Sequence, residues 1–306
     1  MKGFMFSQYY EIHNFRFSLT TDCEELKSEL GLLTPAMAAG PGICSTGWSI
    51  RRFRNQGRGL RSYRIYEADN LIFETDDTVQ LWDSLEWAIM TRILQNTRYF
   101  IQLHASGVDV DGKSLLLVGP SGSGKSSLAL GLLLKGWECL SDEVILITSG
   151  ENRAMPLPRS FHVDSRTLGL FPELAVKLNE AVCIDSSGKM RFDPAVIRSG
   201  WVARSSVPAW LVFPCYKPGN CNDLIPVGET EAMTLLIGQT INLLDHGERG
   251  LETLLQLVRN CRCFRFNTGD MHGASLAMSR LIKQQPPLAL CRDTRAGVEA
   301  ELVHQS

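Results

Sequence analysis

The chain has 306 residues, of which 44% are hydrophobic and 21% charged, and its formal net charge is −2. This balance indicates a globular protein with a sizeable core, and the near-neutral charge excludes, for the chain as a whole, the basic footprint of a nucleic-acid-binding protein. The N-terminus lacks the continuous apolar segment of a secretory signal, and no apolar run approaches the roughly 20 residues that a membrane helix needs. We therefore expect a cytoplasmic protein whose partners are neither nucleic acid nor membrane.

Residues 1–77 predict a small α+β N-terminal region. Residues 9–18 are typical of a strand, residues 21–33 of a short helix, and residues 47–75 of two or three strands separated by turn signals. A helix is expected at about 78–96, where Asp76 and Asp77 are placed to cap it and an apolar side chain recurs every four positions, at Leu81, Leu85, Ile89 and Ile93. We place the boundary between two domains before this helix.

The second domain, residues 78–283, is expected to begin its sheet with a β-hairpin. Strands at 100–110 and 114–118 flank Asp111-Gly112, a preferred tight-turn pair, and the second strand is apolar throughout, as a buried strand should be. Residues 137–148 predict a strand pair or a bent strand. The later elements are a strand at 207–215, helices at about 229–245 and 248–259, a strand at 261–266 and a helix at 273–283. Residues 284–306 are expected to form a poorly ordered tail.

The segment between the hairpin and the next helix carries the strongest motif. Residues 119–126 fit the phosphate-loop pattern GxxxxGK[ST] at every fixed position, after an apolar strand and before a helix. Glycines let successive backbone N–H groups turn inward, and the helix N-terminus adds its partial positive charge, so the loop can cradle the phosphates of a nucleoside triphosphate such as ATP. Lys125 is expected to reach the β- and γ-phosphates and Ser126 to bind Mg²⁺. The expected nucleotide-binding set is Gly119, Ser121, Gly122, Ser123, Gly124, Lys125, Ser126 and Ser127.

Two acids and a histidine are candidates for the chemistry beside this loop. Asp142 and Glu143 follow Lys125 by 17 and 18 residues, at the end of a strand. One acid can take a proton from an attacking hydroxyl and the other can hold Mg²⁺; we assign Asp142 to the first task and Glu143 to the second. The alternative is a solvated turn. His104, 15 residues before Gly119, is expected near the nucleotide edge because its hairpin partner runs into the loop.

Residues 103–144 resemble the catalytic core of the bacterial HPr kinase/phosphorylase family, which has a histidine, a phosphate loop, a helix and an acid pair in this order. The likeness extends more loosely to about residue 280 and is similar there to kinase-only HPr-kinase-related proteins. The resemblance implies an α/β fold with a P-loop kinase core of the HPr kinase/PEP carboxykinase-like type, here after the small α+β region. It implies that Asp142 is the catalytic acid/base and that His104 pairs with it.

Two departures from that family bear on the direction of the reaction. The acid pair is Asp-Glu instead of Asp-Asp, and the family's later Glu-x-Arg-Gly signature, which supplies a metal-binding glutamate and serves the reverse reaction, is not evident. At that place the chain has Pro156-Leu-Pro-Arg159, and we still expect Arg159 to contact phosphate. We therefore expect kinase activity with little phosphorolysis of the product.

Weaker signals leave alternatives open. The six arginines within residues 51–64 suit either a patch for an acidic ligand or a solvated strand face, and the second is favoured. Residues 185–193 are expected to form an exposed loop, in which Lys189 and Arg191 either contact the transferring phosphate or are simply exposed. Spacing suggests no partner for His162.

Three functions are compatible with these residues. The first is an ATP- and Mg²⁺-dependent kinase that transfers the γ-phosphate to a serine of a peptide or protein. The second is a small-molecule kinase, for example one acting on a free amino acid, which would use the same active-site residues. The third is a nucleotide-binding regulatory module that transfers no phosphate. The acceptor and the presence of a homo-oligomer stay open, and the preference for ATP over GTP is weak.

Overall fold

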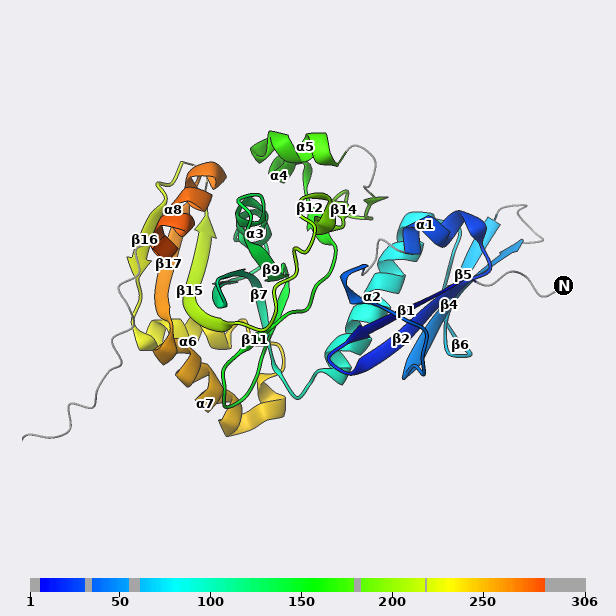
Figure 1. The fold of residues 1–306 in the computed structure, drawn as a ribbon, viewed down its shortest axis with the longest axis horizontal. Helices are drawn as coiled ribbons and strands as arrows, with labels where there is room; N and C mark the ends of the chain where they lie inside the picture. Colours follow the sequence, from blue (N-terminus) through cyan, green and yellow to red (C-terminus); the bar gives the residue numbers. More distant parts are fainter. Residues whose placement is uncertain (1–5, 31–34, 55–60, 179–182, 218, 284–306) are drawn as a thin grey trace, which may run out of the picture.

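The computed structural model describes residues 6–30, 35–54, 61–178, 183–217 and 219–283. The predicted tail at 284–306 and the predicted turn at 55–59 lie outside these residues. The chain forms a mixed α/β structure with two main sheets, one from the N-terminal region and one from the rest of the chain (Figure 1). The expected fold class, an α/β core preceded by a small α+β region, is confirmed. No helix in the described part of the chain is long and apolar enough to cross a membrane.

The N-terminal sheet has six strands in the order β3-β1-β2-β4-β5-β6. Their bounds are β1 Phe6–Ile12, β2 Phe15–Thr21, β3 Ala38–Ala39, β4 Thr46–Arg54, β5 Arg61–Glu67 and β6 Asn70–Thr75. The prediction of one strand over 9–18 is wrong, because His13 and Asn14 adopt positive φ angles of 47° and 66° and turn the chain into a hairpin. In the described part of the helix expected at 21–33, the chain forms a 3₁₀ turn, Glu24–Leu26, and α1, Lys27–Leu30; residues 31–33 lie outside the described residues.

Helix α2, Thr78–Asn96, covers this sheet and begins where the sequence predicts, with the Asp77 carboxylate accepting a hydrogen bond from the Val79 N–H at 2.8 Å. The apolar side chains predicted to line one face of this helix, Leu81, Leu85, Ile89 and Ile93, belong to one core with Phe17 and Trp48 of the N-terminal sheet. The same core includes Leu146 of the larger sheet. The boundary before residue 78 stays a prediction; we propose from this packing that α2 belongs with the N-terminal unit and that the boundary follows it.

The larger sheet has eight strands, in the order β11-β10-β7-β8-β15-β17-β16, with β9 also paired to β7. The predicted hairpin is confirmed as β7 Ile101–Val110 and β8 Lys113–Val118. The predicted strand pair is confirmed as β9 Glu138–Ser141, before the acids, and β10 Val144–Ile147, after them. The later strands are confirmed as β15 Val207–Tyr216 and β17 Arg262–Thr268. The remaining strands are β11 Ala154–Met155 and β16 Asp223–Pro226. β8 pairs in parallel with β15, and β15 with β17, so the carboxyl ends of these three strands meet at one edge.

Helices cover both faces of this sheet (Figure 1). On one face lie α3, Lys125–Leu133, and α8, Met271–Lys283; on the other lie α6, Glu229–Ile237, and α7, Leu243–Asn260. Leu115 and Leu117 face the first layer and Leu116 and Val118 the second, which is why β8 is apolar at every position from Leu115 to Val118. The helix expected at 229–245 ends early at Ile237, and α7 is kinked at Gly247, which has non-helical angles.

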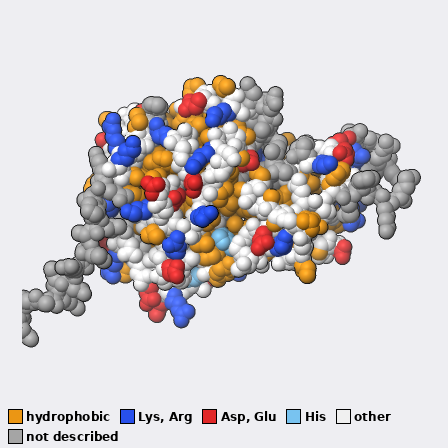
Figure 2. All heavy atoms as spheres, viewed as in Figure 1, with side chains coloured by type: hydrophobic (Ala, Val, Ile, Leu, Met, Phe, Trp, Pro, Cys, Tyr) orange, Lys and Arg blue, Asp and Glu red, His pale blue; other side chains and the backbone are white. Residues whose placement is uncertain are grey.

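A third, small sheet lies beside α3. Its order is β12-β14-β13, with β12 Phe161–Val163, β13 Cys183–Ile184 and β14 Met190–Phe192, and the short helices α4, Ser165–Leu170, and α5, Pro172–Lys177, follow β12. Of the exposed loop expected at 185–193, residues 185–189 form the turn of the β13–β14 hairpin and 186–189 are exposed, whereas residues 190–192 form β14, in which Arg191 and Phe192 are buried. The face shown in Figure 2 carries Lys and Arg interspersed with Asp and Glu, in keeping with the net charge of −2.

Candidate active site

The phosphate-loop motif forms a compact turn between β8 and α3. Gly122 and Gly124 have φ angles of 80° and 98°, which residues with a side chain rarely adopt, and Gly124 is the N-cap of α3. A side chain at Gly124 would also crowd Met271, whose Cε would lie 3.0 Å from the added Cβ. These conformations turn the loop around the N-terminus of α3, where backbone N–H groups and the helix dipole favour an anion.

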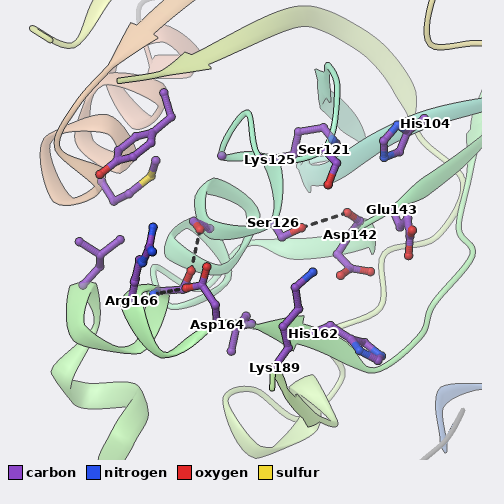
Figure 3. Close-up of a pocket in the computed structure, with 18 residues that line it drawn as sticks. His104, Ser121, Lys125, Ser126, Asp142, Glu143, His162, Asp164, Arg166 and Lys189 are labelled. Carbon is purple, nitrogen blue, oxygen red and sulfur yellow. Dashed lines mark hydrogen bonds between the residues drawn. The ribbon is translucent and has the colours of Figure 1, made fainter. Parts of the chain in front are cut away.

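Lys125 and Ser126 begin α3 and face the same cavity. The Lys125 side chain is 5% exposed, and its Nζ donates hydrogen bonds to the carbonyls of Gly119 at 2.7 Å and Pro120 at 2.9 Å. Burial lowers the pKa of Lys125, although the nearby Glu143 and Asp142 carboxylates oppose this. Ser126 Oγ lies 3.5 Å from the backbone carbonyl of Asp142, so the start of α3 and the acid turn are neighbours (Figure 3).

Asp142 and Glu143 form the turn between β9 and β10 and have different surroundings. Asp142 is 5% exposed, and burial raises the pKa of its carboxyl to about 6 even though Arg159 opposes the rise. Its Oδ1 has no hydrogen-bond partner in the structure; the nearest cation, Arg159 Nε, is 4.0 Å away. The Glu143 carboxylate is about half exposed and is ion-paired with the Arg159 guanidinium. Asp142 thus has a buried acceptor atom without a donor, whereas Glu143 is held in an ion pair.

His104 lies on β7, in register with Val144 of the acid strand, and its backbone N–H donates to the Gln239 carbonyl at 2.8 Å. Burial lowers the pKa of its ring, and the Lys125 charge lowers it further, whereas Glu143 opposes the shift. The ring lies on the same side of the cavity as Glu143 (Figure 3). The pairing with Asp142 that the resemblance implies stays a prediction, because the carboxylate that acts on the pKa of His104 is that of Glu143.

A cavity of about 520 Å³ brings most of the predicted residues together, with lining from His104, Ser121, Gly122, Gly124, Lys125, Ser126, Ser127, Asp142 and Glu143. Gly119 and Ser123 instead line a second cavity on the other side of the loop. Arg159 lines neither of these and is held by Glu86 and Glu143. Its expected contact with phosphate stays a prediction.

The main cavity has two chemically different ends. One end holds the acids and His104. Arg166 lies across the cavity from Glu143 in Figure 3. The lining also includes Leu170, Tyr216 and Met271, of which Tyr216 and Met271 lie beside Gly124 of the loop. Tyr216 ends β15 and Met271 begins α8, so both come from the carboxyl edge of the parallel strands. This edge is where open α/β sheets bind their ligands.

Several residues of the cavity were not identified from the sequence. Asp164 caps α4 by accepting a hydrogen bond from the Thr167 N–H at 2.7 Å, and the Asp-Ser-Arg-Thr run there is a capping pattern that could have revealed this helix. Lys189, by contrast, is one of the two basic residues weighed from the sequence; it lies in the β13–β14 turn, and its side chain points towards Asp142 and Ser126 (Figure 3). Arg191, weighed together with Lys189 from the sequence, is instead 3% exposed and lies outside the cavity lining.

A buried cluster of charges adjoins the acid end. Glu86 of α2 accepts from Arg159 at 3.0 Å, from His162 at 3.1 Å and from Arg191 at 3.3 Å. The other ring nitrogen of His162 lies 3.0 Å from an Asp185 oxygen, so this histidine has two acidic partners that spacing did not suggest. Burial alone would raise the pKa of Glu86, but the hydrogen bond with His162 and the charges of Arg159 and Arg191 lower it to about 2.

The fold and the cavity define an α/β protein in which a strand, a glycine-rich loop and a helix form an anion site beside a buried acid. No family model matches the chain. Sequence comparison finds similarity to curated HPr kinase/phosphorylases: 36% identity over 87 residues with that of Mycoplasmopsis pulmonis, and 41% over 64 residues with those of Chlorobium phaeovibrioides and Chlorobium limicola. The resemblance noted from the motifs is confirmed over this part of the chain.

The coverage of these matches is partial. They span 28% of this chain and 28% of the Mycoplasmopsis protein, and 21% of this chain and 19% of each Chlorobium protein. The structure of the HPr(Ser) kinase/phosphatase from Coxiella burnetii aligns with a TM-score of 0.31 and 14% identity, over 60% of this chain and 93% of that chain.

Proposed function

We propose that the chain is an ATP- and Mg²⁺-dependent kinase that transfers the γ-phosphate to a serine hydroxyl of a peptide or protein. The observation that carries this proposal is the buried Asp142 carboxylate: its Oδ1 lacks a hydrogen-bond partner, and Asp142 lines the same cavity as Lys125 at the N-terminus of α3. A buried acceptor without a donor is costly. A substrate hydroxyl that donates to it would satisfy the carboxylate at the point where a proton must be removed.

The lining of the cavity suits the two halves of a nucleoside triphosphate. The phosphates would lie against the loop and the α3 N-terminus, with Lys125 on the β- and γ-phosphates. The nucleoside would lie against Leu170, Tyr216 and Met271, where the Tyr216 ring, about one-third exposed, offers a stacking surface. Arg166 and Lys189 add positive charge along the same cavity.

The oxygen-rich acid end fits Mg²⁺, which prefers carboxylates and hydroxyls and usually reaches the protein through only one or two side chains. We propose Ser126 and Glu143 as its ligands; the described residues hold no group of three or more His, Cys, Asp or Glu side chains that could bind a metal on their own. When bound with the nucleotide, Mg²⁺ would neutralise phosphate charge.

The residues of the chain then have separate tasks in the transfer. The serine oxygen forms a bond to the γ-phosphorus while the bond from that phosphorus to the β–γ bridging oxygen breaks, and ADP leaves. Asp142 takes the hydroxyl proton, and Lys125 stabilises the charge on the phosphates. His104 is proposed to assist at the acid end through Glu143. Because no glutamate precedes Arg159 in the Glu-x-Arg-Gly position, we propose that the kinase direction predominates.

The proposal is tested by incubating the chain with γ-labelled ATP and Mg²⁺ and an acceptor, with Asp142→Asn as the matched control. The relatives are named for HPr, so purified HPr is the first acceptor to try, followed by a serine-containing peptide library and free L-serine. Label that mass spectrometry locates on a serine of the protein or peptide, and only with the wild-type chain, is the expected result. Label on free serine alone would indicate a small-molecule kinase. Tight ATP binding without any labelled product would indicate a regulatory module.

A further inference from the structure

Glu86 occupies an unusual position for a residue of α2. The helix buries Leu85 and Ile89 in the core that it shares with the N-terminal sheet, yet the Glu86 carboxylate, 6% exposed, is directed to the acid end of the cavity. Its two oxygens hold three basic side chains that come from the segments after β10: Arg159 and His162 on one oxygen and Arg191 on the other. One side chain from α2 thereby joins two segments of the catalytic region.

The Arg159 guanidinium is divided among the acids that surround it. One terminal nitrogen donates a hydrogen bond to Glu86 and the other donates to Glu143. The Nε atom lies 4.0 Å from Asp142 Oδ1, which is beyond hydrogen-bond distance. Coulomb attraction between two such charges in a buried site is strong. The attraction between Glu86 and Arg159 therefore competes with the attraction between Asp142 and Arg159, and it keeps the guanidinium from moving within hydrogen-bond distance of Asp142.

We infer that Glu86 is a positioning residue for the catalytic centre: by holding Arg159 and His162, it leaves the Asp142 carboxylate free for the acceptor hydroxyl. The N-terminal unit thus completes the active site through α2. This inference rests on the proposed kinase function. It concerns only the arrangement of side chains behind Asp142, because Glu86 does not line the main cavity and need not touch nucleotide or acceptor.

The test compares Glu86→Gln, Glu86→Asp and the double variant Glu86→Gln/Arg159→Gln in the full chain. Arg92→Gln is the control, because Arg92 also lies on α2 but forms its ion pair with Glu67 of the N-terminal sheet and does not line the cavity of the acids. For each, the Kd for Mg-ATP, the kcat for ATP turnover with purified HPr or with water, and the Tm are measured. Glu86→Gln should lower kcat by about 10- to 100-fold while the Kd changes by less than about three-fold.

The double variant separates positioning from packing. If an unrestrained Arg159 blocks Asp142, then removing its charge as well should recover part of the lost kcat, although the Tm falls further. A normal kcat in Glu86→Gln, equal losses of kcat and ATP affinity, or no recovery in the double variant would each overturn the inference. Should Glu86→Gln not fold, Glu86→Asp, which keeps the charge but shortens its reach, must show the kcat loss at unchanged Kd. A wild-type chain without turnover would instead refute the proposed function, and this inference with it.

Discussion

Replacing Asp142 with asparagine should inactivate the protein and stabilise it at the same time. The amide keeps the shape of the side chain but cannot take a proton from the acceptor. General base catalysis contributes about 10²–10⁴ in rate, so kcat should fall within that range while the Kd for Mg-ATP stays roughly constant. Because the pKa of the wild-type carboxyl is about 6, wild-type kcat should rise as the pH increases through 6 and then level off.

The stability effect follows from the same pKa. Burial raises it from 3.8 to about 6, and at 1.36 kcal/mol per pKa unit the ionised carboxylate costs the folded state about 3 kcal/mol at neutral pH. Since the folded-state pKa lies above the unfolded value, the carboxyl favours folding fully below pH 3.8, and that contribution is lost as the pH rises through 6. Asp142→Asn avoids this cost, so its advantage over the wild type should be largest at neutral pH and small at pH 4.

Two assays check this pair of effects. Single-turnover transfer from labelled ATP gives kcat across pH 5–8, and urea unfolding at neutral pH and at pH 4 gives the free energy of unfolding. Near-normal turnover in Asp142→Asn would show that another group is the base. A variant that is less stable than the wild type at neutral pH would show that Asp142 is paired in the folded protein and not left without a partner.

Four further variants test the remaining assignments. Lys125→Ala should lose nearly all turnover without unfolding, and unchanged ATP affinity and turnover would contradict the phosphate-loop assignment. Glu143→Gln should raise the Mg²⁺ concentration needed for half-maximal rate, and His104→Ala should cost less turnover than Asp142→Asn; an inactive Glu143→Gln beside an active Asp142→Asn would mean that the two acids have exchanged roles. Because the pKa of Glu86 is lowered from 4.5 to about 2, the carboxylate contributes about 3 kcal/mol of stability above pH 4.5 that is lost as the pH falls towards 2. Urea unfolding of Glu86→Gln should therefore show a weaker decline between pH 5 and pH 2.5 than the wild type, and parallel declines would refute this account.

The sequence predicts best what depends on neighbouring residues. The hairpin at Asp111-Gly112, the loop and the start of α3 are local, since each follows from turn chemistry and glycine conformation within a few positions. The N-cap at Asp77 is recognisable for the same reason. These elements place the loop and the acid turn correctly, because β7 pairs with β8 on one side and with β9 and β10 on the other.

What the sequence did not indicate is contact between distant segments. Glu86 and Arg159 are 73 positions apart, and His162 and Asp185 are 23 apart, so no spacing rule connects them. Leu157 stands where the Glu-x-Arg-Gly signature would place its glutamate. In space, Arg159 is paired with two glutamates, Glu143 of the acid turn and Glu86 of α2. The early hairpin was missed for a different reason, because His13 and Asn14 turn the chain without glycine or proline.

The strand order of the larger sheet also sets the order in which the chain can fold. The last strand of the N-terminal sheet ends at Thr75. In the larger sheet, by contrast, β8 pairs on one side with β15, which begins only at Val207. The strand that leads into the phosphate loop therefore has an open edge throughout synthesis of the intervening chain, and pairings between such distant residues form slowly. Unpaired strand edges are sites of association with other chains. A fragment that ends before residue 207 would contain the whole loop and both acids, yet would leave this edge unpaired beside them.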